Sequence, residues 1–141
     1  MRSLSLALAA GLLAAGLLAA LVSEAPAQPA GRLDVPVMVG GEAELDGCSS
    51  VGQIVGLDPN GDGFLSVRSG PGGKPYRETD RLHNGNQVFV CGDRGPWLAV
   101  VYGPSRDGTC GVATPWPVRQ PYTGPCRSGW VHSRYVRIVA G

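Results

Sequence analysis

Residues 65–72 read Leu65-Ser66-Val67-Arg68-Ser69-Gly70-Pro71-Gly72, and this stretch decides the fold class. Leu65 and Val67 alternate with polar residues, which is the period of a strand with one buried face and one wet face. The run from Ser69 to Gly73 then ends the strand, because proline removes a backbone donor and glycine permits the positive φ values of a tight turn. A short strand that stops at a sharp turn, with no helix after it, predicts an all-β protein.

The same alternation recurs on both sides of this stretch. We expect further strands at residues 51–55, 87–91, 97–102, 129–131 and 136–139. Gly92 to Pro96 has the composition of a hairpin connection between two of them. The 22 glycines and 12 prolines punctuate the chain without forming a repeat. Five or six short strands within residues 45–141 predict a small, strongly bent barrel rather than a large sandwich.

The first 27 residues have the pattern of a signal peptide. Arg2 precedes a continuous apolar run from Leu4 to Val22, and Ala25-Pro26-Ala27 matches a cleavage site, which we place after Ala27. An uncleaved anchor helix is the alternative, because the run is close to the ~20 residues that span a bilayer. Residues 28–44 are predicted to be a linker. Within it, the apolar patch Val35–Val39 can lie along the domain as an edge strand, since its proline confines it to an edge.

Four cysteines follow the predicted cleavage site: Cys48, Cys91, Cys110 and Cys126. An exported chain enters an oxidising compartment, so an even number of cysteines predicts two disulfides, with three possible pairings. We favour Cys110–Cys126, which brackets one irregular loop, and Cys48–Cys91, which would tie the first strand to a central one. Zinc is the competing interpretation, but the chain has no C-x-x-C spacing and its two histidines are far apart. We expect no metal site and no cofactor.

The charge of the chain is nearly balanced. Twelve Lys+Arg residues stand against eleven Asp+Glu residues, for a formal net charge of +1. A chain with so little excess positive charge lacks the basic character typical of proteins that bind nucleic acid or an anionic membrane, so we expect neither as a partner.

Four segments, taken in order, resemble the bacterial SH3-like (SH3b) family. These are Leu65–Gly72, Leu82–Val90 (L-x-x-G-x-x-V-x-V), Gly95–Val100 (G-x-W-x-x-V) and Gly129–Val136 (G-W-V-x-x-x-Y). The resemblance implies an SH3-like barrel with an aromatic-lined binding groove and, as ligand, peptidoglycan or its peptide stems. Tyr135 stands where such barrels keep a groove tyrosine, and Trp97 and Trp130 are the other aromatic residues on matching motifs. Packing in the core or at the rim is the alternative role for both tryptophans.

The chain departs from the family at residues 103–129, where family members usually have a short hairpin. This 27-residue insertion contains Cys110, Trp116, Tyr122 and Cys126 and is too rich in proline for a helix or a central strand. We expect an ordered loop held by its own disulfide. It either carries function, extending or filling the groove, or only covers a face of the barrel and shields an edge.

Three other patterns are weaker. Asp58–Leu65 matches the start of a calcium loop, but position twelve is Ser69 rather than glutamate, and turn chemistry explains the stretch. Cys91 with His83 or His132 would make a thiol nucleophile and base, which disulfide formation disfavours. Arg68 projects from a strand and can contact a carboxylate ligand, although such arginines more often lie on a solvated face.

We therefore predict a periplasmic or secreted, non-enzymatic, monomeric binding module of the cell envelope. Its candidate ligand-binding residues are Trp97, Trp130, Tyr135, Arg68, Trp116 and Tyr122. The alternative is a structural or interaction module that docks an envelope protein through the proline-rich loop.

Overall fold

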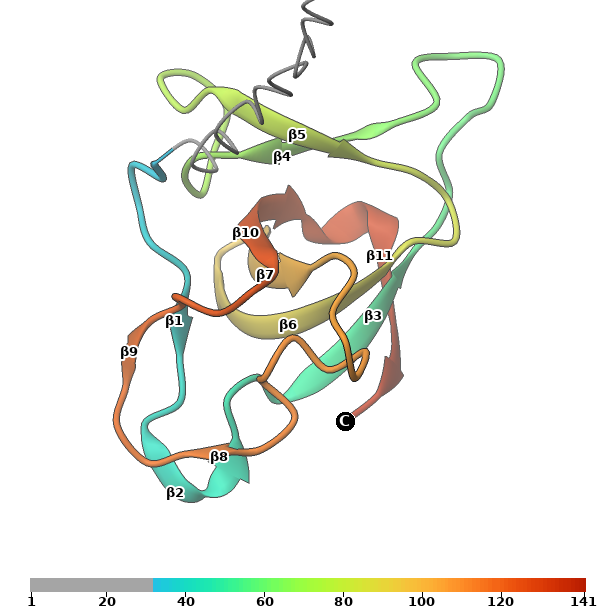
Figure 1. Cartoon of the computed structure of the whole chain (residues 1–141). Helices are drawn as coiled ribbons and strands as arrows, with labels where there is room; N and C mark the ends of the chain where they lie inside the picture. Colours follow the sequence, from blue (N-terminus) through green and yellow to red (C-terminus); the bar gives the residue numbers. More distant parts are fainter. Residues whose placement is uncertain (1–31) are drawn as a thin grey trace, which may run out of the picture.

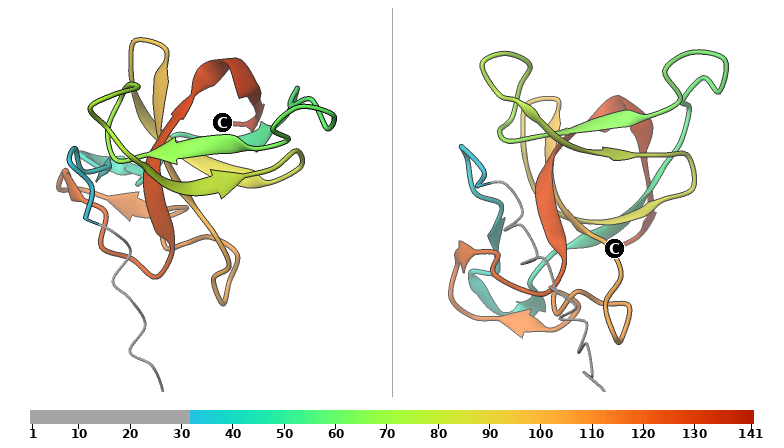
Figure 2. Two further views of the ribbon diagram at one scale, coloured as in Figure 1. Left: turned by 90° about the horizontal axis from the view of Figure 1, so that it is seen from above. Right: turned by 45° about the horizontal axis from the view of Figure 1, so that its top comes forward.

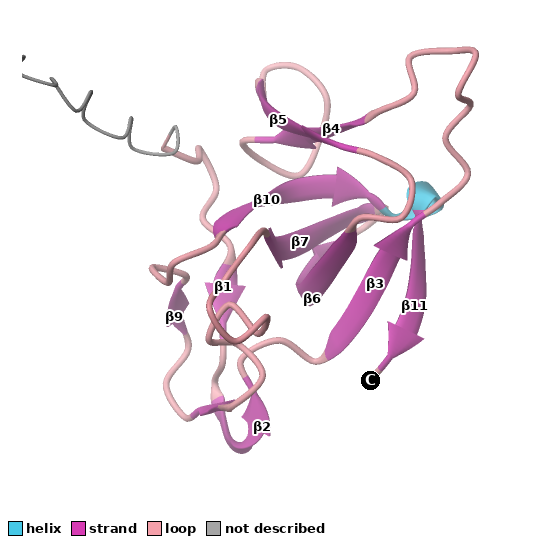
Figure 3. Cartoon of the chain, turned by 45° about the vertical axis from the view of Figure 1, so that its right-hand side comes forward, coloured by secondary structure: helices cyan, strands magenta, loops and turns pink. Residues whose placement is uncertain are grey.

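A computed structural model describes residues 32–141, and the predicted signal peptide lies outside this range. The described chain is built from strands and contains a single helical turn, a 3-10 turn at Ser133–Tyr135 (Figure 3). The all-β prediction is confirmed. The strands are β1 (Met38–Val39), β2 (Glu42–Asp46), β3 (Ser50–Ile54), β4 (Leu65–Arg68), β5 (Glu78–Leu82), β6 (Gln87–Arg94), β7 (Trp97–Tyr102), β8 (Pro115–Trp116), β9 (Gln120–Pro121), β10 (Arg127–His132) and β11 (Val136–Ala140).

Seven of these strands form one antiparallel sheet in the order β11-β3-β6-β7-β10-β4-β5. The sequence predicted five or six strands, and β5 is the additional one in this sheet. It pairs with β4 from Leu65↔Leu82 to Arg68↔Glu78. Its mostly charged residues, Glu78 to Arg81, conceal the alternation by which the other strands were recognised. The ladder runs from β11 to β5 and does not close within residues 32–141.

The sheet is strongly curved, so that β4 and β5 lie across from β3 and β6 (Figure 1). Side chains from both ends of the sheet meet in one inner cluster. Its buried members are Ile54, Leu57, Leu65, Val67, Leu82, Val88, Val90, Val100, Tyr102 and Val131. The curvature lets a single short sheet enclose its own core.

The opposite, outer face of the sheet is also apolar, which follows from the alternation along β6, β7 and β10. Val88 and Val90 face the inner cluster, whereas Phe89 and Cys91 face outward. On β10, Val131 points inward and Trp130 outward. An apolar outer face needs a cover, and two other segments supply it.

Residues 33–39, which we call the strap, form the first part of this cover. Leu33, Val35, Val37 and Val39 all contact the outer cluster, and Val37 and Val39 are fully buried. The sequence predicted a linker with a possible edge strand here. These alternating apolar side chains pack on the sheet, so the segment lies along the domain. The last two strap residues form the strand β1, which pairs with β9.

Residues 103–129, the insertion loop, form the second part. β8 pairs with β2 and β9 pairs with β1, so the loop and the N-terminal segment make two small sheets of their own. They lie together on one side of the main sheet (Figure 2). The loop therefore covers the outer face, and it is held there by strands as well as by its disulfide.

Both favoured disulfide pairings are present, Cys48–Cys91 and Cys110–Cys126, with S–S distances of 2.02 and 2.05 Å. Two disulfides indicate folding in an oxidising, extracytoplasmic compartment. Within residues 32–141, no helix has the length and hydrophobicity needed to span a membrane.

Candidate ligand-binding groove

Ser69, at the end of the motif that decides the fold, is fully buried and anchors the strap. Its backbone N–H donates to the carbonyl of Arg77 at 2.9 Å, and its hydroxyl accepts from the N–H of Arg77 at 3.0 Å. The hydroxyl donates to Asp34, and the Ser69 carbonyl accepts from the N–H of Val35 at 3.0 Å. Every polar atom of this residue is thus used, and two of its four hydrogen bonds go to the strap.

Asp34 and Arg77 tie the strap to the turn before β5. Nη1 of Arg77 lies 3.2 Å from Oδ2 of Asp34, and Nη2 donates to the carbonyl of Arg32. The hydrogen bond from Ser69, together with the Arg77 guanidinium, holds the pKa of Asp34 below its usual value. Both side chains are about half exposed, so this pair orients the strap and contributes little stability by itself.

Trp130 is a core residue in this structure and not part of an open groove. Only 3% of it is exposed, and its Nε1 donates to the carbonyl of Val35 at 2.9 Å. The Arg94 guanidinium lies 5.6 Å from the ring centroid. The structure therefore places Trp130 in the outer cluster, beneath the strap, which is the core-packing alternative for this residue.

Tyr135 lies on the other side of the sheet. Its ring packs against the inner cluster, and its carbonyl accepts from the N–H of Val55 at 2.9 Å. Trp130 belongs to the outer cluster, so the two aromatic residues predicted to share a groove lie on opposite faces.

Trp97 and Arg68 are each engaged by neighbouring parts of the chain. Trp97 is half-buried, and its ring meets His132 edge to face with a centroid distance of 5.3 Å and an interplanar angle of 73°. Nη1 of Arg68 donates to the carbonyl of Tyr76 at 3.2 Å. Neither side chain lines the groove described below.

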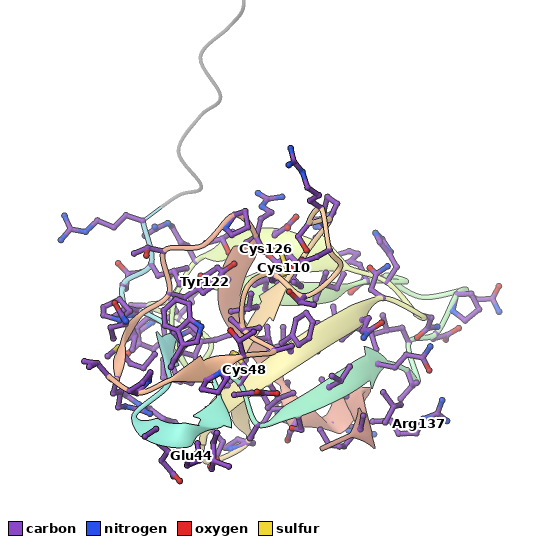
Figure 4. The ribbon with its side chains drawn as sticks, turned by 60° about the horizontal axis from the view of Figure 1, so that its bottom comes forward. Glu44, Cys48, Cys110, Tyr122, Cys126 and Arg137 are labelled. Carbon is purple, nitrogen blue, oxygen red and sulfur yellow. A yellow bond between two sulfur atoms is a disulfide. The ribbon has the colours of Figure 1, made fainter. Side chains whose placement is uncertain are left out.

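The aromatic residues of the insertion loop hold the loop in shape. Nε1 of Trp116 donates to the carbonyl of Gly111 at 2.8 Å. The Tyr122 hydroxyl donates to the carbonyl of Cys110 at 2.8 Å and accepts from the N–H of Cys126 at 3.1 Å. Burial raises the pKa of Tyr122. Figure 4 shows Tyr122 next to the Cys110–Cys126 pair.

A groove with a volume of about 720 Å³ opens between the strap, the turn before β5 and the insertion loop. It is lined by Arg32, Leu33, Asp34, Pro36, Val37, Arg77, Tyr122 and Ser128. Of the residues that the sequence predicted, Tyr122 lines it. Sequence reasoning missed the other lining residues, because most of them lie in the presumed linker. The alternation of apolar and polar residues at positions 33–39 was the signal that could have shown that this segment packs on the sheet.

The thiol interpretation of Cys91 is wrong, since Cys91 is bonded to Cys48. Its supposed partner His132 accepts, through Nδ1, from the N–H of Arg134 at 3.1 Å. In the calcium-like loop, Oδ1 of Asp58 accepts from the N–H of Asn60 at 2.8 Å, an Asx turn. Within the described residues, no three potential metal ligands gather at one point.

Comparisons with protein-family models, with curated proteins and with solved structures find no match to this chain.

Proposed function

We propose that the chain is an exported, non-catalytic binding module of the cell envelope, an SH3b-like domain that binds peptidoglycan through its peptide stems. The observation that supports it is the groove of about 720 Å³, in which guanidinium groups and hydroxyls stand beside an apolar wall. The order of the four SH3b-like segments, which lie on or beside β4, β6, β7 and β10, supports the family assignment.

The groove offers the groups that a stem peptide needs. A planar guanidinium binds a carboxylate through two parallel hydrogen bonds, and stem peptides carry free carboxylates. Arg77 already shares its charge with Asp34. Arg32 makes no ion pair within residues 32–141 and is the group that we assign to the ligand carboxylate. Leu33, which is partly exposed, and Pro36, which is exposed, then contact the apolar part of the peptide.

Sedimentation with purified cell wall tests this proposal. Wild type is expected to sediment, and Arg32→Ala to lose most of the bound fraction. The matched control is Arg106→Ala, an exposed arginine of the insertion loop that does not line the groove and should bind as wild type does. If wild type stays in the supernatant, the peptide-stem proposal fails.

A second candidate function is docking of an envelope protein through the tip of the insertion loop. Val118 is the most exposed large apolar residue of the described chain, at 67%. It stands between Pro117 and Pro121, with β8 on one side and β9 on the other. A partner that covers Val118 would remove this apolar side chain from water, which favours association.

The two candidates separate by substitution. Val118→Asp should abolish co-purification of an envelope protein and leave cell-wall sedimentation unchanged. Ile138→Asp, on β11 and 52% exposed, is the matched control and should change neither. Co-purification that survives Val118→Asp would contradict docking through this loop.

A further inference from the structure

The strap is bound to the domain as a peptide is bound to a recognition site. Its backbone makes three hydrogen bonds to side chains or backbone of the main sheet and the insertion loop: Val35 N–H to the Ser69 carbonyl at 3.0 Å, Trp130 Nε1 to the Val35 carbonyl at 2.9 Å, and Tyr122 N–H to the Val37 carbonyl at 2.8 Å. β1 then adds two residues of antiparallel pairing with β9. Backbone bonds of this kind bind an extended segment without regard to its sequence.

We call the surface that receives the strap the seat; it consists of Ser69, Trp130, Tyr122 and the domain side of the outer cluster. The side chains of the strap and of the seat make this binding selective. Leu33, Val35, Val37 and Val39 enter the outer cluster, where the buried residues on the domain side include Val101, Val112 and Trp130. The intervening residues point away from that cluster. Pro36 stands among them, and because proline has no N–H, the strap leaves no donor unpaired between Val35 and Val37. The seat thus fits an extended segment with small apolar residues at alternate positions around an outward proline.

Three residues that receive the strap are held by contacts that do not involve it. Trp130 lies within β10, which pairs with β7 over six residues. Tyr122 is fixed by its bonds to Cys110 and Cys126, which the disulfide joins. Ser69 is fixed by its two bonds to Arg77. These three residues are therefore positioned by their own neighbours, whereas β9 pairs only with β1 of the strap within residues 32–141.

Two glycines follow the strap and anchor the chain beyond it. Gly40 and Gly41 have φ values of +72° and +114°, a conformation that other L-residues rarely adopt. Their N–H groups donate to the carbonyls of Gly47 and Trp116, each at 2.9 Å. The chain after the strap is therefore attached to β8 and to the end of β2 by bonds that do not involve the strap.

From these contacts we propose that the outer face between Ser69, Trp130 and Tyr122 is a peptide-recognition site, and that the strap is its resident ligand in cis. The trans ligand is an extended segment of a partner protein with the same chemistry, apolar β-branched residues flanking a proline, which enters when the strap leaves. The groove proposed for the stem peptide is lined by the strap itself and by Tyr122, so it exists only while the strap is bound. The inference does not depend on cell-wall binding, because its test measures only the binding of the strap peptide.

A labelled peptide with the sequence of residues 32–40, Arg-Leu-Asp-Val-Pro-Val-Met-Val-Gly, provides the probe. In the wild-type chain the tethered strap competes at high effective concentration, so the peptide should bind weakly in fluorescence anisotropy. Val37→Ala loosens the strap, and we expect it to bind the peptide at least tenfold more tightly than wild type.

Val131→Ala is the matched control, because it removes the same atoms from an equally buried valine on the opposite face of the sheet. It should bind the peptide no better than wild type. A peptide carrying aspartate at the position of Val37 should not bind any of the three proteins. Equal affinity of Val37→Ala and Val131→Ala for the probe overturns the proposal.

Native-state hydrogen exchange of the wild-type chain gives a second measurement, which stands even if Val37→Ala does not fold. The amides of Val35 and Tyr122 join strap and seat, and they should exchange faster than the amide of Val131 in β10. If all three exchange only through global unfolding, the strap is an inseparable part of the core and the inference is refuted.

Discussion

Gly129→Ala is the substitution whose effect follows most directly from the structure. Gly129 lies in β10 beside β4, and a Cβ built there would come within 2.3 Å of Cγ1 of Val67 and 3.2 Å of the Arg68 carbonyl oxygen. Ordinary contacts begin at 3.4 Å, so the two strands would have to separate by about 1 Å. The glycine is required by this close approach and not by a positive φ.

The expected loss is at the upper end of the range for overpacking, about 3 kcal/mol, because Val67 is fully buried and both contacts are to β4. For a domain of this size that loss lowers Tm by roughly 10–20 °C. Thermal and urea unfolding with the disulfides intact provide the assay. Gly92→Ala is the control, since a Cβ at Gly92 meets nothing within 4 Å, and it should be at least as stable as wild type.

A double variant tests the cause. Val67→Ala removes the methyl group that the new Cβ meets, so Gly129→Ala with Val67→Ala should be less destabilised than the sum of the two single changes. If Gly129→Ala is as stable as Gly92→Ala, or if the two effects simply add, the contact between β10 and β4 does not have the importance that we give it.

Three further predictions concern the cover of the outer face. Trp130→Phe keeps an aromatic ring but loses the 2.9 Å bond to the strap, and should lower the free energy of unfolding by about 1–3 kcal/mol in urea titrations; an unchanged value would contradict a bound strap. Serine at both positions of the Cys110–Cys126 bond should cost about 3 kcal/mol by the chain-entropy estimate for this separation, and should raise proteolysis within residues 103–126, which limited digestion with mass spectrometry detects. The lowered pKa of Asp34 means that its contribution to stability is complete above the usual value of about 3.9 and is lost as the pH falls through the lower folded value. In Asp34→Asn, the free energy of unfolding should therefore fall less steeply with decreasing pH between roughly pH 5 and pH 2 than in wild type. If the two proteins have the same pH dependence, the hydrogen bond between Ser69 and Asp34 does not stabilise the fold.

Local patterns in the sequence predicted the strands of the main sheet well wherever one face is apolar. β4, β6 and β7 start where the alternation starts, because burying every second side chain is what makes a strand. β5 was missed for the same reason, since its run of charged residues has no such signal. The disulfide pairing, chosen from the positions of the cysteines relative to loop and strands, is confirmed.

The candidate site was predicted less well. Sequence reasoning placed Trp130 and Tyr135 in one groove, but their separation depends on which face of the sheet each occupies after the strands have paired. The roles of Asp34 and Arg77 depend on contacts between segments more than forty residues apart, for which no local pattern exists.

The sequence by itself determined the strand content, the alternation of inner and outer faces and the need for cross-links in a small exported chain, because each depends on residues near one another. Only the tertiary structure decided what covers the outer face. The presumed linker and the insertion loop pair with each other only as two-stranded sheets, which are marginally stable by themselves, and their apolar residues pack on the main sheet. Whether Trp130 meets a ligand or the chain's own Val35 is therefore settled by long-range packing, which local sequence does not encode.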